Sequence, residues 1–299
     1  MASNNKLIDP VLIVGSTRSG TSMLVQKIGL APGMTQLYEP NALWMTGHAY
    51  RGHEAATELD IRPWVSRRIR KYMLKFQKNH EGKRIAEKSP ANSLRIRYIH
   101  SVFPNSPIVF IYRDGRDFLR SQEEKYQTFK AGTLLLKSTR RNAFNRLKEL
   151  PWWEWPSFAP RYINNIFRSY ISHKPIKWFG IRYPDWKKDL NELDQTQLIA
   201  KQWVVAVETA LADLEHISSN KYIKIRYEDI VSDPRKWFKK IGDFCDINMP
   251  DEYLDEIENT VHTKSIGRYR VELSEDSLQK ALQIMEPCLE RLGYLSEKE

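Results

Sequence analysis

The chain has 299 residues, of which 41% are hydrophobic and 11% aromatic, so it can bury the core of one large domain or two small ones, and extensive disorder is excluded. Its formal net charge of +10 favours anionic partners, although solubility and one anionic-ligand pocket explain that excess better than nucleic-acid binding does. The first ten residues contain no apolar signal segment and no run approaches a membrane span, so we expect a soluble, cytoplasmic protein. Cys245 and Cys288 lack metal-site spacing and lie among apolar neighbours, which predicts two core thiols.

The first predicted element is a strand over Val11–Gly15, which leads through a turn bracketed by glycines into a helix over Thr21–Ile28. Such a turn directs several backbone N–H groups and the positive end of the helix at one point, and this geometry binds a phosphate. The glycine spacing fits the loop of nucleotide hydrolases, but Thr21 stands where that loop requires lysine. The cation of the turn is instead Arg18. We therefore expect a phosphate site that is poorly equipped for magnesium and ATP.

Strand-like runs alternate with helical periodicity along the rest of the chain, without internal repeats. This alternation favours a parallel sheet covered by helices on both faces, with ligands at the carboxyl ends of its strands. The expected fold is a three-layer α/β, P-loop-type nucleotide-binding fold in a single domain over residues 1–299. Further strands are predicted over Met34–Leu37, Arg84–Ala86, Ile108–Tyr112 and Tyr222–Arg226, and further helices over Pro63–Gln77, Ser93–Val102, Gln195–Ile217 and Pro234–Phe244.

Residues 61–80 contain seven Lys or Arg residues and no acidic residue. Their apolar residues recur at helical spacing, which predicts an amphipathic helix with a basic outer face. Solvation explains such a face more simply than an acidic acceptor does.

The predicted strand Ile108–Tyr112 leads directly into the sequence RDGRD (residues 113–117) and a helix that carries Ser121. Arg113 emerges where the sheet ends, and Ser121 lies two helical turns later and can face the same point. A guanidinium fork with a hydroxyl suits a second phosphate group. Local salt bridges at the start of a helix explain the charged residues equally well when this segment is considered alone.

Residues 130–190 are basic, rich in aromatic side chains and without a clear strand. We expect a helical, aromatic insertion that forms a lid over the acceptor crevice. Packing explains most of its rings, and a few can line an acceptor pocket.

Together these segments resemble the sulfotransferases that use 3′-phosphoadenosine 5′-phosphosulfate (PAPS), in the Golgi-type and bacterial branch with arginine in the 5′-phosphosulfate loop. That family has the pattern [KR]-x-G-T-[ST] after its first strand, and an arginine followed eight residues later by a serine for the 3′-phosphate. Two further segments are similar: RYED (226–229), whose tyrosine lies near the adenine in the family, and SIGRYR (265–270), like its closing loop. The resemblance covers residues 10–294 and assigns to the donor Arg18, Ser19, Gly20, Thr21, Ser22, Arg113, Ser121, Tyr227, Ser265, Gly267 and Arg268.

The resemblance implies in-line transfer of a sulfuryl group from PAPS to a hydroxyl or amine acceptor, with no metal. Lys88 matches a lysine that contacts the transferring group, with a surface pair to Glu87 as the alternative. Glu39 matches a catalytic glutamate just after the second strand, and helix capping beside Pro40 is its alternative. Glu87 is the reserve base. Arg18 would neutralise the leaving phosphate.

Two other functions stay open on the sequence alone. A P-loop kinase or nucleotide hydrolase shares the fold and the turn but needs the missing lysine. A non-enzymatic polyanion-binding protein would use the basic stretches at 62–78 and 174–188. We expect a small-molecule or glycan acceptor and no nucleic-acid partner. Small hydroxyl metabolites, sugars, lipids and tyrosyl peptides all stay open as acceptors, and so does the oligomeric state.

Overall fold

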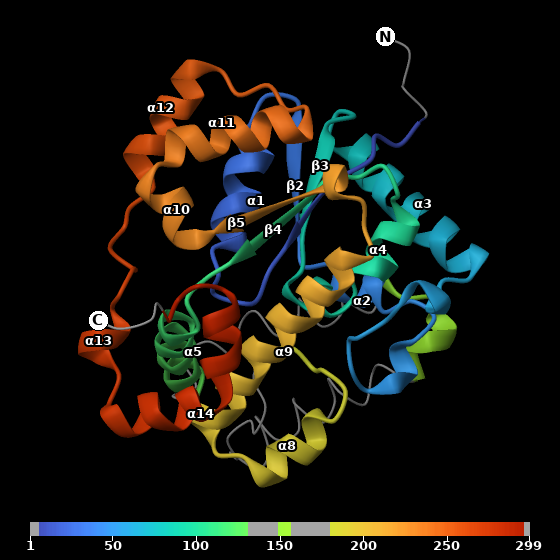
Figure 1. Cartoon of the computed structure of the whole chain (residues 1–299). Helices are drawn as coiled ribbons and strands as arrows, with labels where there is room; N and C mark the ends of the chain where they lie inside the picture. Colours follow the sequence, from blue (N-terminus) through green and yellow to red (C-terminus); the bar gives the residue numbers. More distant parts are fainter. Residues whose placement is uncertain (1–5, 131–148, 157–179, 296–299) are drawn as a thin grey trace.

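The computed structural model describes residues 6–130, 149–156 and 180–295, and a five-stranded sheet lies at its centre (Figure 1). The strands are in the order β2-β3-β1-β4-β5, and every neighbouring pair is parallel. All five predicted strands are confirmed, and the two weakest are longer than expected because they pair with each other up to Tyr38 and Lys88. The strands are β1 (Val11–Val14), β2 (Met34–Tyr38), β3 (Arg84–Lys88), β4 (Ile108–Tyr112) and β5 (Tyr222–Arg226).

Both faces of the sheet are covered, which confirms the predicted three-layer α/β fold. Val11 and Ile13 of β1 belong to one apolar cluster, and Leu12 and Val14 belong to the other; all four side chains are fully buried. Burial on both faces explains why β1 is a continuous apolar run rather than an alternating one. In Figure 1, α11 and α12 lie on one side of the sheet and α3 and α4 on the other.

The helices fall into three groups. The first face carries α1 (Thr21–Leu30), α10 (Tyr227–Ser232), α11 (Pro234–Cys245) and α12 (Asp251–Thr260), and the second carries α3 (Pro63–Asn79), α4 (Ile96–Val102) and α9 (Gln195–Glu215). The other α-helices are α2 (Asn41–Trp44), α5 (Gly115–Lys130), α8 (Trp186–Glu192), α13 (Tyr269–Glu272) and α14 (Glu275–Arg291). Short 3-10 helices are η1 (Ala49–Arg51), η2 (Glu58–Asp60), η3 (Pro90–Leu94), η4 (Trp152–Glu154) and η5 (Ser219–Lys221).

One helix prediction is wrong at its start. The stretch predicted as a helix over Ser93–Val102 is the end of η3 followed by α4, with extended backbone at Arg95 (φ −160°) between them. Arg95 is fully buried and its Nε donates a hydrogen bond to Asn92 Oδ1. That buried polar contact favours the break over a continuous helix. The helices α8, α10, α12 and α13 were not predicted, and a helix at the position of α2 was considered only as the alternative role for Glu39.

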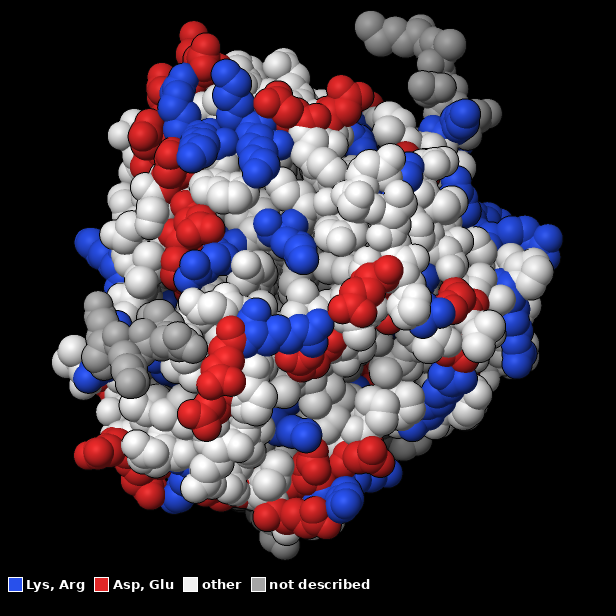
Figure 2. Space-filling model, in the orientation of Figure 1, with Lys and Arg blue, Asp and Glu red and all other residues white. Residues whose placement is uncertain are grey.

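Helix α3 confirms the predicted amphipathic pattern. Val65, Ile69 and Met73 are buried in the core, whereas Arg67 and Lys71 are exposed on the outer face. Blue side chains gather along the right-hand edge of the molecule, where α3 lies (Figure 2).

Three other expectations concern segments away from the sheet. Cys245 and Cys288 are buried free thiols, as predicted. The predicted insertion at residues 130–190 lies largely outside the described residues. Within the described ranges, no helix has both the length and the apolar character needed to span a membrane.

The topology places β1 between β3 and β4, so the connections after these strands meet at one edge of the sheet. Ligands of open parallel sheets bind at this edge, outside the carboxyl ends of the strands. Both predicted phosphate elements, the turn at residues 15–20 and the start of α5, begin here.

Candidate active site

A cleft of about 290 Å³ opens where β1, β4 and β5 end. The turn after β1 forms one wall, α5 forms another, and the C-terminal segment 262–269 closes the third side. The two predicted phosphate elements therefore share one cleft. Its lining includes the predicted residues Arg18, Gly20, Thr21, Ser22, Arg113, Ser121, Tyr227, Ser265 and Arg268.

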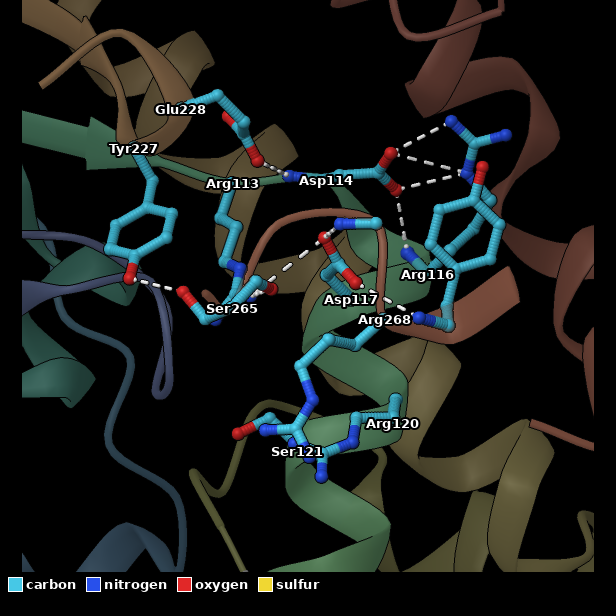
Figure 3. Close-up of polar contacts among 12 residues, drawn as sticks. Arg113, Asp114, Arg116, Asp117, Arg120, Ser121, Tyr227, Glu228, Ser265 and Arg268 are labelled. Carbon is cyan, nitrogen blue, oxygen red and sulfur yellow. Dashed lines mark hydrogen bonds and ion pairs between the residues drawn. The ribbon is translucent and has the colours of Figure 1, made fainter. Parts of the chain in front are cut away.

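Direct contacts hold the walls of the cleft together. Arg113 donates from Nη1 to the backbone oxygen of Arg18 (3.2 Å) and from Nη2 to that of Ser265. Its guanidinium lies 4.5 Å from the centroid of the Tyr227 ring, and the Tyr227 hydroxyl is 2.6 Å from Ser265 Oγ (Figure 3). Arg18 Nε donates to Ser121 Oγ at 2.9 Å. Residues from four distant parts of the sequence thus converge on one point.

Positive charge dominates the lining. Four arginines, at positions 18, 113, 120 and 268, line the cleft together with one carboxylate, Glu124. Burial, and then the charge of Arg113, lower the pKa of Arg18 below its ordinary value. Crowded guanidinium groups of this kind favour an anionic ligand, because each bound negative charge relieves their repulsion.

The backbone is also strained at Arg18, in the turn after β1, and at Glu39, just after β2. Arg18 and Glu39 have positive φ angles of 62° and 47°, a region that non-glycine residues rarely adopt. Such conformations persist where the surrounding structure enforces them, and they are concentrated at functional sites.

Gly20 is required by close packing as well as by its backbone. Its φ is 90°, and a Cβ atom at this position would lie 2.6 Å from Cδ2 of Tyr227. The absence of a side chain lets the ring of Tyr227 lie directly on the turn after β1.

Replacing Gly20 with alanine should therefore destabilise the fold more than the same change at Gly33. Gly33 also has a positive φ (76°), but a Cβ there meets nothing within 4 Å, so it reports the backbone cost alone. We expect Gly20→Ala to lower the free energy of unfolding by about 1 kcal/mol more than Gly33→Ala, measured by urea denaturation. Equal effects would show that Tyr227 does not pack on the turn.

Glu39 and Lys88 form an ion pair at the ends of β2 and β3. Lys88 Nζ is 2.7 Å from Glu39 Oε1, and the lysine side chain is 4% exposed against 38% for the glutamate. The pairing of Tyr38 with Lys88 in the sheet brings the two residues together. The alternatives weighed from the sequence, a capping role for Glu39 and a surface pair of Lys88 with Glu87, are not what the contacts show.

Glu87 points away from Lys88, because successive strand residues face opposite sides of a sheet. Its side chain is fully buried and accepts hydrogen bonds from Trp44 Nε1 (2.9 Å), Ser89 Oγ (2.7 Å) and Asn92 Nδ2 (3.0 Å). Burial raises the pKa of Glu87 to about 7 against the opposing effect of these bonds. Glu39 thus offers a partly exposed carboxylate beside Lys88, whereas the carboxylate of Glu87 is enclosed.

Two predicted donor residues do not line the cleft. Ser19 is fully buried and its hydroxyl pairs with that of Ser16 inside the turn. Gly267 turns its N–H to Asp117, away from the cleft. Both shape the backbone around the site.

The sequence interpretation missed four charged residues. Arg120 lines the cleft beside Ser121 and forms ion pairs with Glu124 and Glu272. Lys125 is one helical turn beyond Ser121, and burial, followed by the charge of Arg18, lowers its pKa. Asp117 and Glu272 contact the closing segment. Helical spacing from Arg113 and Ser121 could have identified Arg120 and Lys125.

The end of the chain is tied to the same region. The Tyr294 hydroxyl donates to Glu228 Oε2 (2.7 Å), whose Oε1 accepts the N–H of Asp114 (3.1 Å). Arg116 donates to the backbone oxygen of Tyr294, and the Arg226 guanidinium lies 4.6 Å from its ring centroid. Tyr294 thus links the start of α5, which follows Arg113, to the start of α10, which begins with Tyr227.

No group of three or more His, Cys, Asp or Glu residues suited to a metal ion occurs in the part of the chain that the structure describes. The cleft instead offers guanidinium groups, hydroxyls and backbone N–H groups, which are donors suited to phosphate and sulfate.

The sequence profile of the sulfotransferase domain matches residues 8–280. No curated protein gives a match. Among solved structures, sulfotransferase STF9 from Mycobacterium avium is 13% identical, with a TM-score of 0.50 over 96% of this chain and 77% of its own. The sulfotransferase domain of the Synechococcus PCC 7002 olefin synthase is 15% identical (TM-score 0.49, 99% of both chains), and a mouse sulfotransferase complexed with PAP is 13% identical (0.46, 96% and 88%). The first of these structures supports the fold described above.

Proposed function

This chain belongs to the sulfotransferase domain family, and on that premise we propose that it transfers a sulfuryl group from PAPS to a hydroxyl or amine of a small-molecule or glycan acceptor. The choice of PAPS as the donor rests on the shared cleft. There the turn after β1 and the start of α5 each present a cation, so that the cleft can bind two separate anionic groups. PAPS carries such groups at both ends of its ribose.

The residues present fit that donor. Arg113 is 6% exposed, and its buried Nε has no hydrogen-bond partner among the described residues. A buried donor without a partner is costly, and an incoming phosphate oxygen would satisfy it. The first residues of α1, Thr21 and Ser22, line the cleft, and the backbone N–H groups at the start of an α-helix have no partners within the helix, so they suit a second anion.

Each wall has a separate role in this proposal. Arg113, Ser121, Ser265 and Arg268 bind the 3′-phosphate. Arg18 and the backbone of residues 19–22 bind the 5′-phosphosulfate, and Tyr227 contacts the adenine side. When bound, PAPS supplies an activated sulfuryl group on a phosphate leaving group.

The proposed catalytic residues accept one proton from the acceptor and stabilise the negative charge of the transferring and leaving groups. Glu39 accepts the proton of the attacking acceptor hydroxyl, so that the new S–O bond forms as the bond from sulfur to the 5′-phosphate breaks. Lys88 stabilises the negative charge on the sulfuryl oxygens, and Arg18 stabilises the charge that develops on the leaving phosphate. Positioning and electrostatics supply most of the acceleration, as in phosphoryl transfer.

The rival nucleotide functions are testable in one comparison. The threonine at position 21 and the arginine at 18 favour a phosphosulfate over magnesium-ATP. Equilibrium dialysis should show saturable binding of PAPS and little binding of ATP with magnesium. Binding of polyanions with a steep salt dependence, without nucleotide preference, would support the non-enzymatic alternative.

Replacing Arg113 with alanine should weaken binding of adenosine 3′,5′-bisphosphate by about 1.5–3 kcal/mol, the usual contribution of a hydrogen bond to a charged group. Isothermal titration calorimetry measures this loss directly. Arg235→Ala is the control, because Arg235 is a surface arginine that pairs with Asp251 and Asp255 and does not line the cleft. Unchanged affinity in Arg113→Ala would remove Arg113 from the nucleotide site.

The remaining expectations stay predictions from the sequence. They are a cytoplasmic location, the absence of a metal requirement, the absence of a nucleic-acid partner and the lid at residues 130–190.

A further inference from the structure

The segment 262–269, which closes the cleft, is attached to α5 by one buried carboxylate. Asp117 is 1% exposed. Its Oδ2 accepts the backbone N–H of Gly267 (2.7 Å), and its Oδ1 accepts that of Tyr269 (3.1 Å). Figure 3 shows this carboxylate pointing from α5 into the bend of the segment. Both oxygens of Asp117 are thus used to position backbone that lies far away in the sequence.

Apolar burial does little to fix the segment. Residues 262–264, 266, 268 and 270 are exposed, and within 262–268 only Ser265 and Gly267 are partly covered. Apolar packing therefore contributes little before Tyr269, and polar contacts decide where the segment lies. Besides Asp117, the polar contacts are those of Ser265 with Arg113 and Tyr227, and the surface pairs of Glu272 with Arg268 and Arg120.

The carboxylate of Asp117 also lies next to Arg113, which lines the cleft. Asp117 Oδ2 is 3.8 Å from Arg113 Nη2, and Arg113 in turn donates to the backbone oxygen of Ser265. Asp117 therefore lies between the arginine and the segment that carries Ser265 and Arg268. All three of those residues line the cleft.

We propose that Asp117 is a positioning residue, which holds the segment 262–269 in its closed form before the donor binds, so that Ser265 and Arg268 already face the 3′-phosphate. This inference rests on the function proposed above. Its energetic advantage is preorganisation, because a segment that is already ordered loses less conformational entropy when the nucleotide binds. Asp117 itself does not touch the nucleotide.

The role requires a carboxylate rather than any polar group of the same shape. Both partners of Asp117 are N–H donors, and an asparagine amide offers only one acceptor oxygen. In Asp117→Asn, one backbone N–H would face the amide NH₂ group and lose its hydrogen bond. The variant keeps the volume of the side chain and removes one anchor.

The test compares Asp117→Asn with Asp114→Asn in the full chain. Asp114 is also buried at the start of α5 and pairs with Arg116, but it makes no hydrogen bond to the closing segment. Amide hydrogen exchange at Gly267 and Tyr269 should become roughly tenfold faster or more in Asp117→Asn and stay unchanged in Asp114→Asn. Affinity for adenosine 3′,5′-bisphosphate should fall by roughly tenfold in Asp117→Asn only.

A double-mutant cycle with Arg268→Ala separates positioning from a general loss of stability. If Asp117 acts through the segment, Asp117→Asn should cost less than about threefold in affinity once Arg268 is already alanine. The KM for PAPS should rise in Asp117→Asn while kcat at saturating donor stays close to that of the unchanged chain.

The inference would be overturned if Asp117→Asn left amide exchange at Gly267 and Tyr269 unchanged. It would also be overturned if Asp117→Asn caused the same loss of nucleotide affinity with Arg268 present as with alanine at that position. A chain that binds no adenosine bisphosphate in its unaltered form would instead overturn the proposed function. The exchange experiment needs no nucleotide, so the two failures are distinguishable.

Discussion

Replacing Lys88 with alanine should lower the turnover number about a hundredfold or more, as the loss of a transition-state donor does in other enzymes. The side chain is 4% exposed, so its charge acts across a poorly solvated site. In the proposed mechanism Lys88 acts on the sulfuryl oxygens during transfer, and Lys88 is not among the residues that line the nucleotide cleft. Affinity for adenosine bisphosphate should therefore change much less than turnover.

The matched control is Lys83→Ala, just before β3, where the lysine is 43% exposed and pairs with Glu81. It should leave turnover within about twofold, because exposed pairs contribute little. Single-turnover kinetics with saturating PAPS measure both variants. A parallel fall in nucleotide affinity and turnover in Lys88→Ala would make Lys88 a residue for ground-state binding.

Glu39→Gln should lower kcat by about a hundredfold to ten-thousandfold, the range for a lost general base. Glutamine keeps the shape and can still accept the hydrogen bond from Lys88, but it cannot take the acceptor's proton. The position is partly exposed, so stability should change little. The measurement is the initial rate with saturating PAPS and acceptor.

Glu81→Gln provides the control, since it removes one carboxylate from an exposed lysine pair far from the cleft. Near-normal turnover in Glu39→Gln would assign the proton to another group. Because Lys88 and Glu39 are in contact, the double variant should lose much less than the sum of the two single losses.

The sequence predicted the sheet well because its strands carry local signals. The run Val11–Val14 is apolar on both faces, and the pattern alone identifies it. The ends of β2 and β3 were predicted too short, since their last pairing, Tyr38 with Lys88, depends on a neighbouring strand. The helix break at Arg95 likewise depends on a contact of a buried side chain that periodicity does not register.

The convergence of residues on the cleft was predictable for those in the connections that follow a strand. Arg18, Arg113 and Tyr227 lie at the carboxyl ends of their strands, and the topology brings these ends together. Contacts between distant segments were not predictable. Nothing in the local sequence of Asp117 indicates Gly267 or Tyr269, which are far along the chain. The separation of Glu87 from Lys88 could have been read from strand alternation.

The contacts of Tyr294 and of the segment 262–269 have a consequence for biosynthesis. The turn at residues 15–20 leaves the ribosome well before Ser265, Arg268 and Tyr294 do. Domains fold as units when their residues have emerged. A nascent polypeptide that already displays the turn therefore lacks the closing side of the cleft, and competence for sulfuryl transfer arises only after the segment 262–269 and Tyr294 have emerged.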